Sequence, residues 1–159
     1  MTPKNKESVK RVEKVIKEFD KNLKVSLLKT SARTALEAAT SLNCDVGAIV
    51  KSLLFKTDNK YALFLIAGDK KASLKKIKKN IKFSDVSMAS ADEVKSITGY
   101  TIGGVSPVGH INNVDIYIDN SLERFDFLFA AAGHPNCIFK ISFLDLKKIT
   151  KGVIEDIIE

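Results

Sequence analysis

The sequence predicts an α+β fold, in which helices pack on a central sheet that is mixed or largely antiparallel. Apolar runs of strand length alternate with short amphipathic segments, but without the regular spacing of βαβ units. The chain has 159 residues, 45% of them hydrophobic and 28% charged, which suits one well-packed domain and is short for two. No repeat, low-complexity linker or change in composition divides it. Residues 1–159 are therefore expected to form a single compact domain.

Helical spacing and capping motifs predict the helices. Hydrophobic residues recur every three or four positions from about Pro3 or Ser8 to Phe19, which predicts an amphipathic helix. Thr34-Ala35-Leu36-Glu37 and Ser90-Ala91-Asp92-Glu93 are capping boxes, and each predicts the start of a helix. Further short helices are expected at residues 73–79 and 144–149, with a turn or short helix at 121–124.

Six apolar runs rich in branched and aromatic residues predict the strands. The six runs are Val25–Leu28, Ile49–Lys56, Lys60–Ile66, Val114–Asp119, Phe127–Ala132 and Cys137–Ile141. Thr57-Asp58-Asn59 joins the second run to the third, which predicts a β-hairpin.

The charge of the chain comes almost entirely from lysine. The formal net charge is +7, and of the 26 basic residues only Arg11, Arg33 and Arg124 are arginines. One dense run consists of Lys70, Lys71, Lys75, Lys76, Lys78, Lys79 and Lys82. Such a run either follows a phosphate backbone by charge or forms a solvated helix face. Scarce arginine argues against reading base edges in duplex DNA, so no DNA partner is expected.

Composition also excludes several other classes. No apolar run approaches the roughly 20 residues that span a bilayer, and the charged N-terminus lacks the apolar core of a signal peptide. We therefore expect a cytoplasmic protein without a membrane partner. Cys44 and Cys137 form no disulfide framework and are expected to be small buried residues. A zinc site needs three or four ligands and the chain has two histidines, so no metal is expected. No organic cofactor is expected either.

The glycine-rich segment Thr98–Gly109 is the most informative motif. Gly103, Gly104 and Gly109 fall within seven residues of one another, together with Pro107. Glycine permits positive φ and close backbone approach. The segment therefore forms either a tight structural turn or a main-chain cradle for a polar group. It lacks the Gly-Lys-Ser/Thr of a phosphate-binding P-loop, which argues against nucleoside triphosphates.

Two side chains outside this loop could carry chemistry. Lys51 lies in the otherwise apolar segment Ile49–Phe55, where a lysine either extends from a strand edge to solvent or points into a pocket. His134 follows a strand of small residues in Gly133-His134-Pro135, as a surface turn histidine or as a site residue. A serine-hydrolase triad through Ser106 is not favoured, because the nucleophile-elbow motif G-x-S-x-G is absent.

Taken together, these segments resemble a known family. The motifs are Thr34-Ala35 with Ala38-Ala39, Ile49-Val50-Lys51-Ser52-Leu53, Gly99-Tyr100 with Gly103-Gly104-Val105-Ser106-Pro107-Val108-Gly109, and Ala132-Gly133-His134-Pro135. In this order they resemble the YbaK/ProX family of trans-editing aminoacyl-tRNA deacylases. These are free-standing relatives of the editing domain inserted in bacterial prolyl-tRNA synthetases. The resemblance runs from about Val9 to Ile149.

The resemblance implies a fold and an activity. The implied sheet curls into a partial barrel, and the implied reaction is hydrolysis of the ester between a wrong amino acid and the 3′ end of a tRNA. Lys51 matches the pocket lysine that helps to hold the acceptor end or the ester carbonyl. Gly103 matches the glycine whose backbone positions the attacking water and the terminal ribose, and His134 contributes to substrate fixing or catalysis. Other motif residues are expected to bind substrate: Ser52, Gly104, Ser106, Pro107, Gly109 and Gly133.

The chain departs from one subgroup of that family. Members that clear cysteine from proline tRNA carry an acidic residue a few positions after the glycine that matches Gly133, whereas Asn136-Cys137-Ile138 follows here. Gly133-His134-Pro135 is more similar to subgroups that edit alanine or other small side chains. The implied partner is a mischarged tRNA, and a synthetase or translation factor could supply tRNA selectivity.

Two other functions stay open on the sequence. One is a non-catalytic module that binds tRNA or an anion on the same scaffold. The other is a hydrolase of some different small acyl ester, which would turn over free esters without depending on tRNA.

Overall fold

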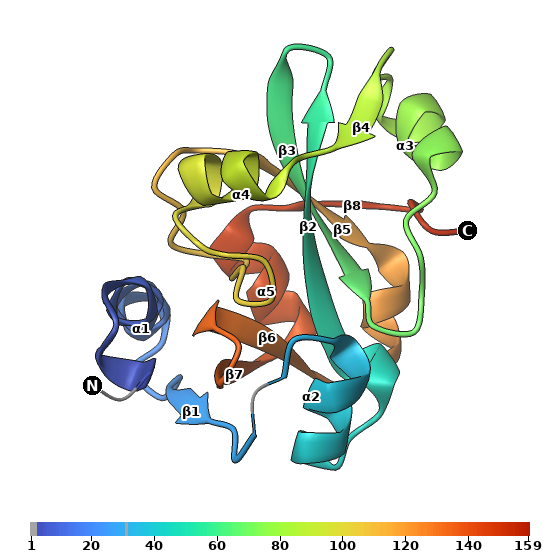
Figure 1. Ribbon diagram of the computed structural model, residues 1–159. Coiled ribbons are helices and arrows are strands. Elements are labelled where there is room, and N and C mark those ends of the chain that lie inside the picture. Colours follow the sequence, from blue (N-terminus) through green and yellow to red (C-terminus); the bar gives the residue numbers. More distant parts are fainter. Residues whose placement is uncertain (1–2, 31) are drawn as a thin grey trace.

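The computed structural model describes residues 3–30 and 32–159 and confirms an α+β domain (Figure 1). The described residues contain five α-helices: α1 (Glu7–Phe19), α2 (Ala35–Leu42), α3 (Leu74–Ile81), α4 (Ala91–Thr98) and α5 (Phe143–Thr150). They also contain eight strands: β1 (Val25–Leu27), β2 (Ile49–Thr57), β3 (Lys60–Ala67), β4 (Val86–Met88), β5 (Asp115–Asp119), β6 (Phe127–His134), β7 (Cys137–Ser142) and β8 (Val153–Glu155). Short 3-10 helices are η1 (Pro3–Asn5), η2 (Val46–Ala48) and η3 (Asn120–Arg124).

The strands form one mixed sheet that curls into a half-barrel (Figure 1). Its order is β1-β7-β6-β2-β3-β5-β8, and β4 pairs with β2 outside this path. Among the described residues, four pairings are antiparallel (β1–β7, β2–β3, β2–β4 and β6–β7) and three are parallel (β2–β6, β3–β5 and β5–β8). The prediction of a mixed, largely antiparallel sheet is therefore confirmed.

One edge of β2 is only partly paired, and this feature positions the site. Along its other edge, β2 pairs with β3 over its length, from Val50 opposite Ala67 to Thr57 opposite Lys60. On the partly paired edge, β6 pairs only with Ile49 and Val50, while β4 pairs only from Phe55 onward. Residues 51–54 lie between these two partners. The sheet therefore opens at this point, and the opening lies beside the Lys51-Ser52 motif.

Helices cover the sheet on both faces. α1 contributes Val9, Val12 and Ile16 to the largest core cluster, which also holds residues of β2, β3, β6 and β7. α2 packs Ala38 and Ala39 against Ile49 and Ile138, because alanine lets a helix approach a sheet closely. α3 covers the other face through Ile77, which packs with Phe55, Phe64 and Ile66.

The predicted helix starts are found with one difference. Ser90 forms the full capping box, in which its hydroxyl accepts from the Glu93 N–H and the Glu93 carboxylate accepts from the Ser90 N–H. At α2 the Thr34 hydroxyl also accepts from the Glu37 N–H, 3.2 Å away. The Glu37 carboxylate instead accepts from the Thr34 hydroxyl at 3.0 Å, so only half of the predicted box forms there.

Two strands were not predicted. β4 and β8 each span three residues, which is too short for a period of two to be recognised. Both add to the edges of longer strands, with β4 on β2 and β8 on β5. Their formation depends on the tertiary pairing more than on their own residues.

Candidate active site

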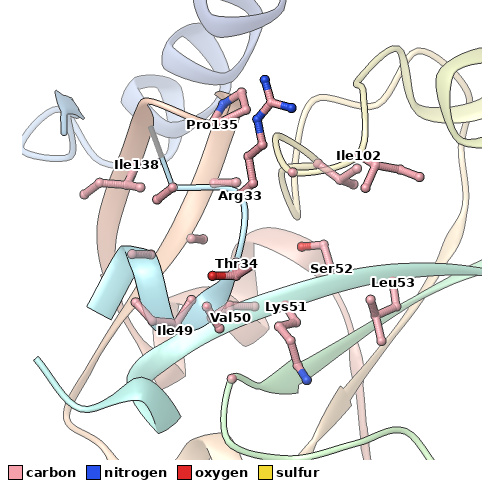
Figure 2. Close-up of a pocket in the computed structure, with 18 of the residues that line it drawn as sticks. Arg33, Thr34, Ile49, Val50, Lys51, Ser52, Leu53, Ile102, Pro135 and Ile138 are labelled. Atoms are coloured by element: carbon pink, nitrogen blue, oxygen red, sulfur yellow. The ribbon is translucent and has the colours of Figure 1, made fainter. Parts of the chain in front are cut away.

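A cavity of about 540 Å³ opens at the partly paired edge of β2 (Figure 2). Residues 51–54 form one wall, and the N-terminus of α2, the glycine loop and the β6–β7 turn enclose the rest. Most of the lining is apolar and includes Val50, Leu54, Val94, Val105, Ala130 and Ile138. This size and lining are typical of a small-molecule site, in which a few polar groups orient the ligand.

Ser52 supplies one of those polar groups. Its Oγ atom is buried and has no hydrogen-bond partner within the described part of the chain. Figure 2 shows the hydroxyl pointing from β2 toward the hollow below Ile102. A buried hydroxyl without a partner costs free energy, on the order of 1–3 kcal/mol. A ligand that accepts or donates a hydrogen bond here would recover that cost.

Lys51 points to the opposite side of β2 from Ser52. Lys51 lines the cavity, but its Nζ donates a hydrogen bond to the backbone carbonyl of Lys70, and Figure 2 shows the ammonium directed away from Arg33 and Ile102. Burial lowers the pKa of the Lys51 ammonium, which the nearby Asp69 carboxylate partly offsets. The structure thus brings Lys51 to the wall of the predicted site without aiming its charge at the glycine loop.

The glycine loop reaches the cavity through a tight turn. The Gly104 N–H donates to the Thr101 carbonyl at 2.9 Å, and Gly103, with a φ of 95°, occupies the third position of that turn. A positive φ at this position requires glycine or a strained residue. Gly103 lines the cavity, whereas its own N–H donates to no acceptor in the described part of the chain.

The glycine loop and the β6–β7 turn are in direct contact. A Cβ added at Gly104 would lie 2.9 Å from both the Cα and the N of His134. Gly103 lies close to Pro135 and Arg33. The third glycine of this contact, Gly133, has a φ of 92° and packs on α1, where the Ser8 hydroxyl donates to its carbonyl at 2.9 Å.

His134 has a defined orientation in this turn. Its Nδ1 accepts from the Asn136 N–H at 3.0 Å, so the neutral ring carries its proton on Nε2. Partial burial, followed by the positive charges of Lys6 and Arg33, lowers the pKa of this imidazole below its ordinary value of 6.5. At neutral pH His134 is therefore a hydrogen-bond donor at the cavity rim.

The second half of the glycine loop does not line the cavity. Ser106 and Pro107 are buried, and the Ser106 hydroxyl accepts from the Val108 N–H at 3.3 Å. The Gly109 carbonyl accepts from the Arg11 Nε at 2.6 Å. These contacts lie within the loop and its supports. A substrate-binding role for Ser106, Pro107 and Gly109 stays a prediction.

Three side chains, those of Tyr100, Arg11 and His110, hold this half of the loop in place. Burial raises the pKa of Tyr100 to about 12, so its hydroxyl stays protonated and reaches the carbonyls of Val108 at 2.7 Å and Gly109 at 2.8 Å. The Arg11 guanidinium lies 4.9 Å from the centre of the Tyr100 ring. The His110 ring donates from Nε2 to the Ser106 carbonyl at 2.7 Å. The loop is thereby held as a rigid unit.

Sequence reasoning missed Arg33. Its side chain is exposed beside Gly103 and Pro135, and it lines the cavity. The available signal was its rarity, since Arg33 is one of three arginines and directly precedes the capping motif at Thr34.

Two further observations concern other classes of site. In residues 3–30 and 32–159, no group of three or more His, Cys, Asp or Glu side chains is arranged to hold a metal ion. Among the helices that the structure describes, none is both long and apolar enough to cross a membrane.

Comparison with known proteins assigns the family. A family model described as the aminoacyl-tRNA editing domain matches residues 29–149. The chain belongs to this family. It is similar over most of its length to the uncharacterized protein YwhH of Bacillus subtilis. The two are 31% identical over 144 residues, which cover 90% of this chain and 91% of that protein.

Part of a larger enzyme is also similar to this editing domain. The proline–tRNA ligase of Caldicellulosiruptor bescii is 31% identical over 121 residues, which cover 76% of this chain and 21% of the ligase. The chain thus matches about a fifth of the length of that enzyme. A solved structure described as a proposed trans-editing enzyme for prolyl-tRNA synthetase superposes with a TM-score of 0.91 at 34% identity, covering 100% of this chain and 99% of that one. The resemblance read from the motifs is therefore confirmed.

Proposed function

We propose that this editing domain hydrolyses the ester that links a wrong amino acid to the terminal adenosine of a tRNA, acting as a free-standing deacylase. One observation carries the proposal beyond family membership. The Gly103–Gly104 turn and the His134 turn are in contact at the rim of an apolar cavity of about 540 Å³. Polar main-chain and imidazole donors thus meet the space in which an aminoacyl group would lie.

The chemistry needs few groups, because an aminoacyl ester is already activated. A positioned water attacks the carbonyl, and hydrogen-bond donors stabilise the oxyanion that develops. Of the two neighbouring glycines, Gly104 donates its N–H to the Thr101 carbonyl, so the Gly103 N–H is the donor that we assign to this purpose. Loss of one such donor typically lowers the rate by about 10²–10³.

In the proposed reaction, His134 holds the substrate. Because Nδ1 is occupied by the Asn136 N–H, the imidazole offers Nε2–H to an oxygen of the ester or of the terminal ribose. In this tautomer the ring holds no free basic nitrogen, so it does not accept the proton of the attacking water. We propose that the 2′ or 3′ hydroxyl of the substrate ribose helps to orient that water.

The ribose hypothesis has a direct test. A mischarged tRNA that ends in 2′-deoxyadenosine is expected to be cleaved at least about 100-fold more slowly than the ribose substrate, because an interaction made in the transition state is lost. Equal rates would refute the role of the hydroxyl and leave the rest of the proposal standing.

Lys51 can assist hydrolysis only if its side chain changes its hydrogen-bond partner. To assist hydrolysis, its ammonium has to exchange the Lys70 carbonyl for the ester carbonyl or a phosphate of the acceptor end. Because burial already lowers the pKa of this ammonium, part of the desolvation cost of such a move is met before substrate binds.

The orientation of Lys51 favours one alternative, a non-catalytic module that binds the tRNA end. An ammonium held by Lys70 leaves the cavity without a positive charge from β2. A panel of mischarged tRNAs, with seryl-, alanyl- and cysteinyl-tRNA first, separates the two functions. Release of amino acid above the spontaneous rate supports the deacylase, whereas binding without release supports the module.

Selectivity between amino acids is expected to rest on the size of the cavity. An apolar pocket separates side chains that differ by one methylene by only about 1–3 kcal/mol. A cavity of this kind excludes a larger correct amino acid more effectively than it chooses among small wrong ones. We therefore propose relaxed specificity for small side chains.

A further inference from the structure

A second cavity shares a wall with the first. It has a volume of about 650 Å³ and lies between the N-terminus of α1, the C-terminal end of α4 and the β6–β7 turn. Arg33, Ile102, His134 and Pro135 line both cavities. A ligand bound at this shared wall could therefore extend one end into each cavity.

The second cavity is positively charged. Lys6, Arg33 and Lys95 line it, and no Asp or Glu does so among the described residues. Arg11 adds a fourth charge below its floor, since a Cβ on Gly99 would lie 2.6 Å from a terminal nitrogen of Arg11. That buried nitrogen has no hydrogen-bond partner in the described part of the chain.

The charges of this cavity converge on the shared wall. Partial burial of the His134 ring lowers its pKa, and the charges of Lys6 and Arg33 lower it further. Lys6 precedes α1, whereas Arg33 precedes α2. The two cations therefore act on one point from different elements, next to the glycine loop. A neighbouring anion at this point would offset their mutual repulsion.

We propose that the second cavity binds the phosphodiester immediately 5′ of the terminal adenosine of the tRNA, while the first cavity holds the aminoacyl group. This inference rests on the proposed function, because it needs an aminoacyl ester in the first cavity. Lys6 and Lys95 are the groups that it assigns to phosphate, with Arg33 between the phosphate and the ribose.

The chemistry of a nucleotide fits the order of the two cavities. In an aminoacyl adenosine the ester is carried on the 2′ or 3′ oxygen, while the phosphate is attached at the opposite end of the ribose, on the 5′ carbon. The apolar cavity suits the amino acid, the shared wall suits the ribose, and the cationic cavity suits the phosphate. A single-stranded RNA end is bound mainly by such backbone charge contacts.

The lysine-rich helix α3 is the rival site for the phosphate backbone. None of its lysines lines either cavity, and Lys76 pairs with Asp156 at 3.0 Å. Figure 1 shows α3 on the side of the molecule opposite α1. The described contacts therefore favour the cavity beside α1 for the strand that leads into the site.

The experiment measures binding of a short RNA that carries no amino acid, 5′-ACCA-3′, over a series of salt concentrations. Lys6→Ala/Lys95→Ala is expected to weaken binding about tenfold and to reduce the salt slope by roughly 0.7, because both lysines are assigned to one phosphate of a single strand. Lys14→Ala/Lys17→Ala, which removes the same charge from exposed positions of α1 that line neither cavity, should bind like the wild type. Adenosine without phosphate should bind the double variant and the wild type equally.

Three results would overturn the inference. These are unchanged RNA affinity in Lys6→Ala/Lys95→Ala, a larger loss in Lys78→Ala/Lys79→Ala on α3, or inorganic phosphate that binds as tightly as the RNA. Because the RNA carries no amino acid, the measurement does not depend on ester hydrolysis. A protein that binds the RNA as expected but cleaves no ester would contradict the proposed function and support the cavity assignment.

Discussion

Lys51 and Ser52 are neighbours in the chain but serve opposite faces of β2. The Ser52 hydroxyl points toward the cavity and has no hydrogen-bond partner among the described residues, whereas the Lys51 ammonium donates to the Lys70 carbonyl. Alternation along a strand places adjacent side chains on opposite faces, so a motif that contains both residues cannot direct both at one ligand without a change of rotamer. The catalytic assignment of Lys51 therefore depends on movement of its side chain.

Replacement of Lys51 tests that assignment. Lys51→Ala is expected to lower deacylation by at least about 100-fold, as for loss of one oxyanion donor, while the far-ultraviolet circular dichroism stays unchanged. The matched control is Lys56→Ala, which removes an exposed lysine from the same strand. Full turnover in a folded Lys51→Ala variant would remove this lysine from the mechanism.

The pH dependence of His134 follows from its surroundings. Because its pKa in the folded protein is depressed below 6.5, the unfolded chain binds a proton in the window just below pH 6.5 that the folded protein does not. The stability that this residue contributes is therefore complete above pH 6.5 and is lost as the pH falls through the folded-state pKa. A titration followed by NMR should give His134 a midpoint below 6.5.

One variant tests the cause of that depression. Lys6→Ala removes a positive neighbour and is expected to raise the His134 midpoint, whereas Lys14→Ala should leave it unchanged. A wild-type midpoint at or above 6.5 would contradict both the partial burial of the ring and the field that we describe.

At the scale of elements, the contact between the glycine loop and the β6–β7 turn defines the site. The loop approaches the turn without side chains at Gly103 and Gly104 and is held from behind by Tyr100 and Arg11. The glycines are thus required for two different reasons. Gly103 has a positive φ and room for a methyl group at ordinary van der Waals distance, while Gly104 has no positive φ and no room for a methyl group.

Alanine at these two positions separates the reasons. Gly104→Ala brings a methyl group within 2.9 Å of the His134 backbone and is expected to lower the free energy of unfolding by about 1–3 kcal/mol and to shift the His134 ring resonances. In Gly103→Ala the nearest atom lies 3.6 Å away, so only backbone strain of about 1–2 kcal/mol is expected, with the His134 resonances retained. Unchanged resonances in a folded Gly104→Ala variant would contradict the close contact.

Local sequence signals predicted most elements but not every detail. The capping box at Ser90 and the glycine that ends α4 depend on neighbouring residues, and both appear as expected, with Gly99 at a φ of 82°. β4 and β8 could not be predicted, because three residues are too few to show the alternation of apolar and polar side chains, and their pairing partners are distant in sequence. The half-formed cap at Thr34 has a different cause, because it depends on a side-chain rotamer of Glu37 that the capping motif does not specify.

At the scale of the whole molecule, the site exists because β2 changes partner. β6 pairs with its first two residues and β4 with its last three, and the cavity lies in the gap between them. No local pattern predicts such a gap, since it depends on three segments that are far apart in the chain. The contribution of Arg33 to the cavity wall and the second cavity became visible only in the folded molecule.

The central claim is that this domain by itself cleaves aminoacyl esters carried on tRNA. The most direct measurement is the initial rate of amino acid release from seryl-, alanyl- and cysteinyl-tRNA, compared with the spontaneous rate and with the methyl esters of the same amino acids. We predict acceleration of at least one tRNA ester and little turnover of the free esters. Absence of acceleration on every mischarged tRNA of the panel, or equal turnover of free esters, would contradict the account.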